Sequence, residues 1–240
     1  QAETAVVESD PVDQTETVLN LDDLEVHFDV DRSLLETLRG RGADKVRAVD
    51  GVSLDVVQGQ TLGIVGESGS GKTTMARAIM GLARRTGGRI ELMQRLLPPA
   101  LNERQRETLR HLQFVFQNPE EALNPYLTVG ETLRRPFMTL LDKSQDEAEA
   151  AVAALLTAVS LPPDFASRLP GQLSGGEKQR VAIARAFATN PDLLIADEAV
   201  SALDVSVQAS ILNMLARLQQ EHGNTLLFIS HDLAVVGYLA

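Results

Sequence analysis

The stretch GESGSGKT, residues 66–73, follows an apolar run at 61–65 and precedes a helix-forming run at 75–80. It fits the pattern G-x-x-x-x-G-K-[ST] of a loop that joins a strand to a helix and cradles phosphate groups. Its glycines let the backbone curve with N–H groups pointing inward, and the following helix adds the positive end of its dipole. An ordinary glycine-rich turn is the alternative interpretation. The flanking strand and helix favour a site for a nucleoside triphosphate.

Residues in and directly after this loop are the candidate ligands of the triphosphate. Lys72 is expected to reach the β- and γ-phosphates as a point charge, and Thr73 to offer its hydroxyl to Mg²⁺. The predicted nucleotide-binding residues of this segment are Gly66, Glu67, Ser68, Gly69, Ser70, Gly71, Lys72, Thr73 and Thr74.

Composition is typical of a globular protein: of 240 residues, 44% are hydrophobic and 23% charged, enough for one large α/β domain or two small ones. The absence of cysteine excludes disulfides and thiolate metal sites. Ten acidic residues and no Lys or Arg fall within residues 1–31, and the charges nearly balance over the remainder. Because no excess of positive charge can follow a phosphate backbone, direct nucleic-acid binding is disfavoured.

The order of patterns along the chain predicts the elements around the loop. Residues 1–17 are polar and acidic and are expected to form a disordered tail or linker, ahead of a nucleotide-binding domain at 18–240. Strands are predicted at 21–28, 89–92, 112–117, 193–198 and 226–230, with a strand pair at 46–57 after a charged connection at 31–45. Helices are predicted at 75–80, 101–112 and 178–189, with a helical insertion at 118–172 that holds helices at 129–141 and 144–159.

A second set of polar residues lies at the ends of later elements. Ser174 and Glu177 have the Ser-x-x-Glu spacing of a capping box, and a plain helix cap is the simplest interpretation. Asp197 and Glu198 end an apolar strand, where they are expected beside the ligand crevice of a parallel sheet. In a chain with a phosphate loop, they suit an Asp for Mg²⁺ and a Glu for the attacking water. His231 follows the last predicted strand and is a candidate γ-phosphate contact.

Together these features resemble the ATP-binding cassette (ABC) ATPases, over about residues 21–240. GESGSGKT matches the family's Walker A loop, Gln117 its Q-loop glutamine, LSGGE (173–177) its signature, LLIADE (193–198) its Walker B strand, SALD (201–204) its D-loop and His231 its switch histidine. LSGGE is the most specific, because it separates this family from other P-loop NTPases. The resemblance implies an α/β fold: a P-loop NTPase (RecA-like) core with an antiparallel β subdomain and an inserted α-helical subdomain.

The resemblance also implies ATP and Mg²⁺ as cofactors and a role for each residue. Glu198 would be the general base and His231 the γ-phosphate sensor, with Lys72 and Gln117 as further catalytic residues. Thr73 and Gln117 would coordinate Mg²⁺, with Asp197 acting through water. The expected contacts to a nucleotide held by a second ABC domain are Ser174, Gly175, Gly176, Glu177 and Asp204.

A narrower resemblance is to the ATPases of oligopeptide and dipeptide importers, a group that includes nickel and glutathione carriers. The segments that carry it are VRAVDGVSL (46–54), GIVGESGSGKTT (63–74), FQNPEEALNP (116–125) and DVSVQASIL (204–212). It implies a peripheral protein at the cytoplasmic face of the membrane that drives peptide import by ATP hydrolysis. The implied partners are a second ABC ATPase domain (identical, paralogous or fused in tandem), integral membrane permease subunits docked beside the Q-loop and, indirectly, an extracytoplasmic solute-binding protein.

Three departures from the family pattern carry expectations of their own. No aromatic residue occurs at 42–48, so Val46 is expected to give adenine only apolar contact. Ala199 follows the catalytic Glu where proline is common, with little expected effect. The chain starts at Gln1 and ends nine residues beyond His231, which suggests half of a tandem two-ATPase polypeptide.

Two other functions are compatible with the pattern. A soluble ABC ATPase acting on nucleic acid or ribosomes is disfavoured by the lack of a basic face, of cysteines and of a long heptad run. A module that closes on ATP without turnover is disfavoured because Glu198 and His231 are both present.

Overall fold

The computed structural model describes residues 5–7, 16–29 and 45–239. Within these residues the core is a sheet of five strands in the order β1-β4-β9-β8-β7. β4, β9, β8 and β7 run parallel, and β1 pairs antiparallel with β4 at the edge. The bounds of these strands are β1 Ala5–Val7, β4 Thr61–Val65, β7 Leu112–Val115, β8 Leu193–Asp197 and β9 Thr225–Ser230.

A second sheet is antiparallel, in the order β3-β2-β5-β6. Its strands are β2 Thr17–Asp29, β3 Lys45–Val57, β5 Gly87–Leu92 and β6 Arg95–Leu96. The predicted strand pair at 46–57 is therefore wrong, because this segment is the single strand β3. Gly51 and Asp23 take left-handed φ angles of 76° and 51° where the β2–β3 register shifts, so the chain forms an irregularity there and not a hairpin.

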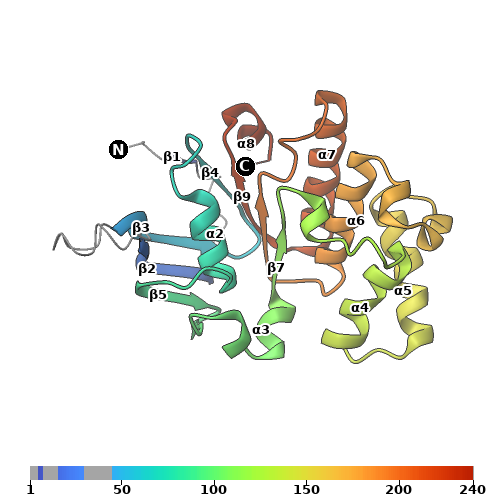
Figure 1. Ribbon diagram of the computed structural model, residues 1–240, viewed down its shortest axis with the longest axis horizontal. Coiled ribbons are helices and arrows are strands. Elements are labelled where there is room, and N and C mark those ends of the chain that lie inside the picture. Colours follow the sequence, from blue (N-terminus) through green and yellow to red (C-terminus); the bar gives the residue numbers. More distant parts are fainter. Residues whose placement is uncertain (1–4, 8–15, 30–44, 240) are drawn as a thin grey trace, which may run out of the picture.

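Helices cover both faces of the parallel sheet and form the insertion. Their bounds are α2 Lys72–Met80, α3 Arg106–His111, α4 Val129–Leu140, α5 Gln145–Ala158, α6 Gly175–Phe187, α7 Val205–His222 and α8 Leu233–Leu239. Short 3₁₀ turns are η1 Leu101–Glu103, η2 Pro119–Glu121, η3 Pro163–Ser167 and η4 Pro170–Gln172. Figure 1 shows the antiparallel sheet and the α4–α5 insertion on opposite sides of the parallel strands.

The two faces of the parallel sheet pack into two hydrophobic clusters. Leu194 and Phe228 point into the cluster formed with α4, α5, α6 and α7. Ile195 and Leu227 point into the cluster formed with α2 and the antiparallel sheet. This alternation follows from the period of two residues in a strand, and it explains why β8 and β9 are apolar throughout.

The predicted insertion is confirmed in its helices, with small shifts at their ends. Capping boxes at Thr128 and Ser144 start α4 and α5. The helix predicted at 101–112 is interrupted, since Arg104 and Gln105 take extended backbone angles between η1 and α3. The helix predicted at 178–189 starts three residues earlier, at Gly175, because Ser174 caps it.

Part of the predicted disordered tail is ordered. Ala5–Val7 form β1, and Thr17 begins β2. The rest of that tail, apart from Glu16, and most of the predicted charged connection at 31–45 lie outside the described residues. Among the described residues, no helix combines the length and the hydrophobicity needed to cross a bilayer.

Candidate nucleotide site

The phosphate loop leads from β4 into α2, as predicted. Gly71 is the N-cap of α2 and has φ 96°, and a Cβ placed there would lie 2.1 Å from the carbonyl oxygen of Ala48. Only glycine therefore fits this position. The first turn of α2 contains no acidic side chain, so its N–H groups and the positive end of the helix dipole are available to an anion.

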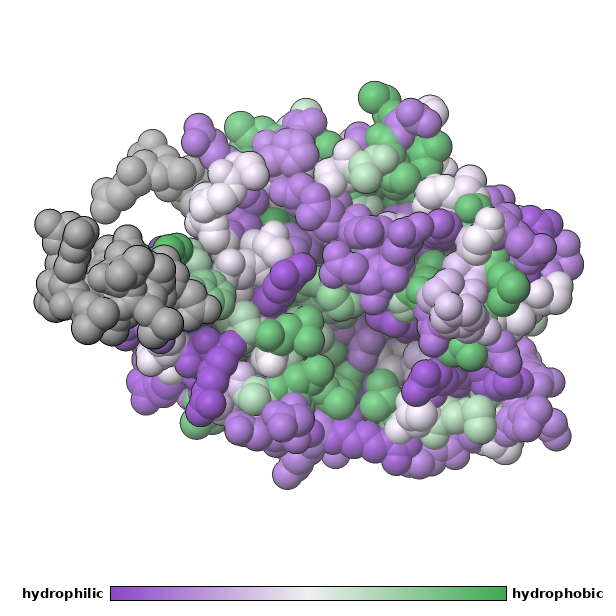
Figure 2. Space-filling view, in the orientation of Figure 1, coloured by the Kyte–Doolittle hydropathy of each residue, from purple (hydrophilic) through white to green (hydrophobic). Residues whose placement is uncertain are grey.

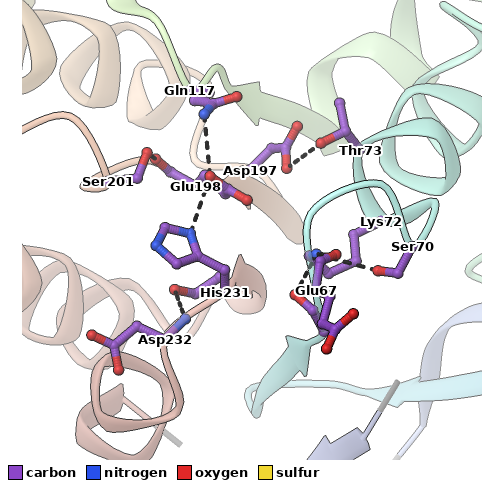
Figure 3. A network of polar contacts seen from close by, with 12 residues as sticks. Glu67, Ser70, Lys72, Thr73, Gln117, Asp197, Glu198, Ser201, His231 and Asp232 are labelled. Atoms are coloured by element: carbon purple, nitrogen blue, oxygen red, sulfur yellow. Dashed lines mark hydrogen bonds and ion pairs between the residues drawn. The ribbon is translucent and has the colours of Figure 1, made fainter. Parts of the chain in front are cut away.

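Lys72 lies inside the curve of this loop. Its side-chain nitrogen donates hydrogen bonds to the carbonyl oxygens of Gly66 (2.7 Å) and Glu67 (2.8 Å) and to the hydroxyl of Ser70 (3.3 Å). The residue is buried. An ammonium group donates but does not accept, so phosphate oxygens can replace these carbonyl acceptors when a triphosphate enters the loop (Figure 3).

Thr73 and Asp197 supply oxygen atoms next to the loop. The Thr73 hydroxyl donates a hydrogen bond of 3.1 Å to Oδ1 of Asp197, whose side chain is buried at the end of β8. Burial raises the pKa of Asp197, and the hydrogen bond from Thr73 opposes that shift. A carboxylate beside a hydroxyl fits Mg²⁺, which takes oxygen ligands and is commonly held by one or two carboxylates together with substrate phosphates.

Glu198 lies between two polar side chains from distant parts of the chain. Its Oε2 accepts a hydrogen bond of 3.1 Å from Nε2 of Gln117 and lies 3.4 Å from Nδ1 of His231 (Figure 3). Glu198 has a left-handed φ of 46°, and its backbone is held by a hydrogen bond to Ile229 and by the hydroxyl of Ser201. The carboxylate is therefore fixed near Asp197, where it can accept a proton from a water molecule.

The structure thus joins six of the predicted residues into one site, from four separate segments of the chain. They are Lys72, Thr73, Gln117, Asp197, Glu198 and His231. The roles of these residues toward a nucleotide and Mg²⁺ stay predictions.

The signature turn, residues 173–177, lies outside this site. Ser174 caps α6, and Glu177 accepts hydrogen bonds from the Ser174 backbone (2.7 Å) and hydroxyl (2.8 Å), which lower its pKa. These residues line a recess together with Asp204. Within the described residues, no hydrogen bond or ion pair joins this turn to the site around Lys72. In a single copy the turn is a helix cap, as the simplest interpretation has it.

One exposed aromatic side chain, on the strand paired with β3, was missed by the sequence reasoning. Val46 is 54% exposed, and Phe28, directly opposite it in the β2–β3 pairing, is 47% exposed. Val46 lies two residues along β3 from Ala48, whose carbonyl abuts Gly71. Residues 42–48 contain no aromatic, but cross-strand pairing supplies one from β2. Leu24, Val26 and Phe28 occupy every second position of β2, and only Phe28, the last of them, is exposed. An aromatic residue at the end of this apolar alternation was the signal in the sequence that could have pointed to it.

An apolar groove lies between the parallel strands and the insertion. Figure 2 shows apolar side chains gathered on this face, between the antiparallel sheet and the insertion. The residues that line the groove include Met80, Leu109, Phe116, Leu127 and Leu140, with the cations Arg135 and Arg185 and no acidic residue. Phe116 directly precedes Gln117, so the groove adjoins the site.

Comparison with known proteins identifies the family. Residues 49–201 match the model of the ABC transporter family. The oligopeptide transport ATP-binding protein OppF of Salmonella typhimurium is 42% identical over 95% of this chain and 68% of its own length. AppF of Bacillus subtilis, also an oligopeptide transport ATP-binding protein, is 43% identical over 94% of this chain and 68% of its own length. A putative peptide import ATP-binding protein of Brucella abortus is 46% identical, over 93% of this chain and 66% of its own length. The chain spans about two thirds of the length of these relatives.

A solved structure extends the likeness to three dimensions. The ATP-binding cassette MJ0796, in a dimeric post-hydrolysis state bound to ADP and Pi, has a TM-score of 0.74 and 29% identity, covering 92% of this chain and 90% of that one. The predicted fold, a P-loop core with an antiparallel subdomain and a helical insertion, is confirmed by this likeness and by the two sheets and the insertion described above. The chain belongs to the ABC transporter family of ATP-binding domains.

Proposed function

We propose that this chain is the ATP-hydrolysing, nucleotide-binding domain of a peptide importer and that it works by ATP-driven pairing with a second such domain. The observation that carries the proposal is the position of Glu198, whose carboxylate lies between Gln117 and His231 beside the Thr73–Asp197 pair. A base, a phosphate cradle and a candidate Mg²⁺ ligand set therefore lie in one site.

The chain's own residues account for the chemistry of hydrolysis. The loop amides and Lys72 bind the β- and γ-phosphates, and Glu198 orients a water molecule and takes its proton. His231 contacts the γ-phosphate. Thr73, Gln117 and Asp197 would hold Mg²⁺, and this ion would offset the negative charge of the phosphates. The adenine ring would lie against Phe28 and Val46, because both are exposed and adjacent in the sheet.

Pairing follows from the place of the signature turn. Ser174, Gly175, Gly176 and Glu177 form the N-terminus of α6 outside the site around Lys72, and Asp204, the N-cap of α7, lines the same recess. A helix N-terminus suits an anion, so this turn would face the γ-phosphate held by the second domain. The dimeric state of MJ0796 supports that arrangement. The second domain can be another copy, a paralogue or a domain fused in tandem.

Peptide import is supported by the names of the relatives, which are oligopeptide and peptide transport ATP-binding proteins. The apolar groove beside Phe116 is the proposed docking site for permease subunits, which would hold the chain at the cytoplasmic face of the membrane. An extracytoplasmic solute-binding protein would act through those subunits. Nickel or glutathione-type solutes are alternative cargoes of the same machinery. A role on nucleic acid or ribosomes is disfavoured by the charge balance.

The test is Glu198→Gln, which keeps the shape of the side chain and removes its basicity. Hydrolysis should fall about a hundredfold or more, while ATP binding persists, because a positioned base contributes roughly 10²–10⁴ in rate. Steady-state phosphate release and equilibrium ATP binding measure the two effects. Full hydrolysis by the variant would contradict the assignment of Glu198, and failure of the wild type to hydrolyse ATP would contradict the function.

A further inference from the structure

The turn that follows Gln117 is held by three cationic side chains from two helices. Arg77 of α2 approaches Glu121 at 3.7 Å, and Lys178 of α6 donates a hydrogen bond of 2.7 Å to Glu120. Arg185 of α6 donates to the carbonyl oxygen of Ala122. Three consecutive residues, 120–122, therefore join the phosphate-loop helix to the signature helix.

Of these contacts, Lys178–Glu120 lies closest to the signature turn. Lys178 is four residues after Ser174, and its backbone N–H bonds the Ser174 carbonyl oxygen at 2.9 Å in the first turn of α6. Its side chain is 20% exposed, and that of Glu120 is 66% exposed. Lys178 lowers the pKa of Glu120 by its hydrogen bond and charge, so the pair is ionised at neutral pH.

Gln117, at the other end of this link, contacts the catalytic carboxylate. Its amide bonds Glu198, and only Asn118 and Pro119 separate it from Glu120. Asn118 caps the turn η2 by accepting a hydrogen bond of 3.0 Å from the Glu120 backbone, which makes the segment a short rigid connection. One side chain, that of Lys178, thus ties the start of the signature helix to the residue that touches the chain's own nucleotide site.

We propose that Lys178 is a positioning residue that couples this chain's own nucleotide site, around Lys72, to its signature turn at Ser174. When Gln117 leaves Glu198 to meet an incoming nucleotide, the turn at 119–121 moves, and the Lys178–Glu120 ion pair carries the signature turn with it. Occupancy of one site would thereby place Ser174 for the other. The inference rests on the proposed pairing of two domains, and it assigns a role to a side chain that touches no nucleotide.

The size of the effect follows from the type of contact. A partly exposed ion pair contributes a modest coupling, and loss of one changes an equilibrium by roughly two- to fivefold. Lys178→Met and Glu120→Gln should each leave ATP affinity within about twofold of the wild type and lower kcat by about that two- to fivefold factor. The charge-reversed double variant Lys178→Glu/Glu120→Lys should recover most of the loss, because it rebuilds the pair with opposite polarity.

A matched control is available in the same chain. Arg134 and Glu149 form an ion pair of 2.9 Å between α4 and α5, with similar exposure, but touch neither Gln117 nor the signature turn. Arg134→Met should leave ATP affinity and kcat unchanged. Wild-type kcat in both single variants of the Lys178–Glu120 pair, or a double variant no better than the singles, would overturn the proposal.

A second measurement does not depend on turnover or on the identity of the partner domain. The chain has no cysteine, so labels can be attached at Gly171→Cys, where an added Cβ meets nothing within 4 Å, and at the exposed Gln220→Cys on α7. With spin labels at these two positions in the Glu198→Gln variant, ATP should change the distance between the labels. Double electron–electron resonance measures that distance. Lys178→Met should shrink that change and the charge-reversed pair should restore it.

The outcomes separate this inference from the proposed function. A wild-type chain that binds ATP but never hydrolyses it would contradict the function, and the label distance would still decide the inference. The inference would be overturned if the ATP-dependent change in label distance were equal with and without Lys178. It would also be overturned if the labelled Glu198→Gln chain that keeps Lys178 showed no such change.

Discussion

The hydroxyl of Thr73 and the carboxylate of Asp197 are joined by a hydrogen bond of 3.1 Å, although 124 residues separate them in the chain. Thr73 lies in the first turn of α2, the helix that follows the phosphate loop, and Asp197 ends strand β8. The contact connects the two segments that would share Mg²⁺. It also holds the carboxyl group of Asp197 in a buried position, which has a consequence for stability.

Asp197→Asn should raise the stability of the folded chain at neutral pH and abolish Mg²⁺-dependent nucleotide binding. Burial raises the pKa of Asp197 in the folded state, so folding disfavours the carboxylate. Removing that charge should increase the free energy of unfolding by roughly 1 kcal/mol, the usual scale when a functional residue is replaced by a more stable one. Urea unfolding at pH 7, together with Mg-ATP binding, measures both effects.

The pH dependence of this difference is a sharper check. Because the folded pKa is raised, the contribution of Asp197 to stability is fully present below the unfolded value of about 3.9 and is lost as the pH rises through the folded pKa. The difference in free energy of unfolding between Asp197→Asn and the wild type should therefore become smaller as the pH falls from 7 towards 4. A constant gap over this range would argue against a raised pKa.

Phe28→Ala should weaken ATP binding by about 1–3 kcal/mol, the range measured for base–aromatic stacking. Phe28→Tyr should bind ATP like the wild type, because the ring is kept. Inorganic tripolyphosphate lacks a base, so its affinity should not change in Phe28→Ala. Leu96→Ala, at an exposed apolar residue in the same sheet, is the control and should leave ATP affinity unchanged. Equal loss for both ligands would place the defect in the fold and not in base contact.

Gly71→Ala and Gly69→Ala form a matched pair within the loop. Both glycines have left-handed φ angles, of 96° and 83°, so alanine costs about 1–2 kcal/mol of backbone strain at either position. At Gly71 the added methyl also meets the Ala48 carbonyl oxygen at 2.1 Å, whereas at Gly69 it meets nothing within 4 Å. Thermal unfolding and ATP binding should show a large loss for Gly71→Ala and a modest one for Gly69→Ala. Similar losses for both would mean that the contact with Ala48 has no influence.

Mixing two defective variants tests whether each site is shared between two copies. Lys72→Ala removes the phosphate contact of a copy, and Ser174→Arg blocks its signature turn. If sites are composite, each variant alone should be inactive, and a mixture should recover up to roughly a quarter of wild-type activity by random pairing. ATPase activity against mixing ratio measures this. If the mixture stays inactive while wild-type copies pair and hydrolyse ATP, the composite arrangement is wrong.

Much of the fold could be predicted from local patterns. Alternating or continuous apolar residues indicate strands such as β2, β8 and β9, and the capping boxes at Thr128, Ser144 and Ser174 mark the starts of α4, α5 and α6. The prediction of one continuous helix at 101–112 was less accurate, because the segment forms η1 and α3 with two extended residues between them. Composition alone did not reveal the extended residues Arg104 and Gln105, because Arg104 turns inward there to donate to the Ile79 and Pro98 carbonyl oxygens.

The local amino-acid sequence by itself determined the phosphate loop of this protein. Glycines at fixed spacing, followed by Lys72 and Thr73, lie between a strand and a helix, and this pattern does not depend on the rest of the chain. Only the tertiary structure decided that Gln117, Glu198 and His231 meet, because they lie just beyond the carboxyl ends of three neighbouring parallel strands that bring distant segments to one edge. It also decided that Phe28 stands beside Val46, since the pairing depends on the register between β2 and β3 and on the irregularity at Gly51. Spacing along the chain carries no information about either meeting, because sheet register is a property of packing between strands.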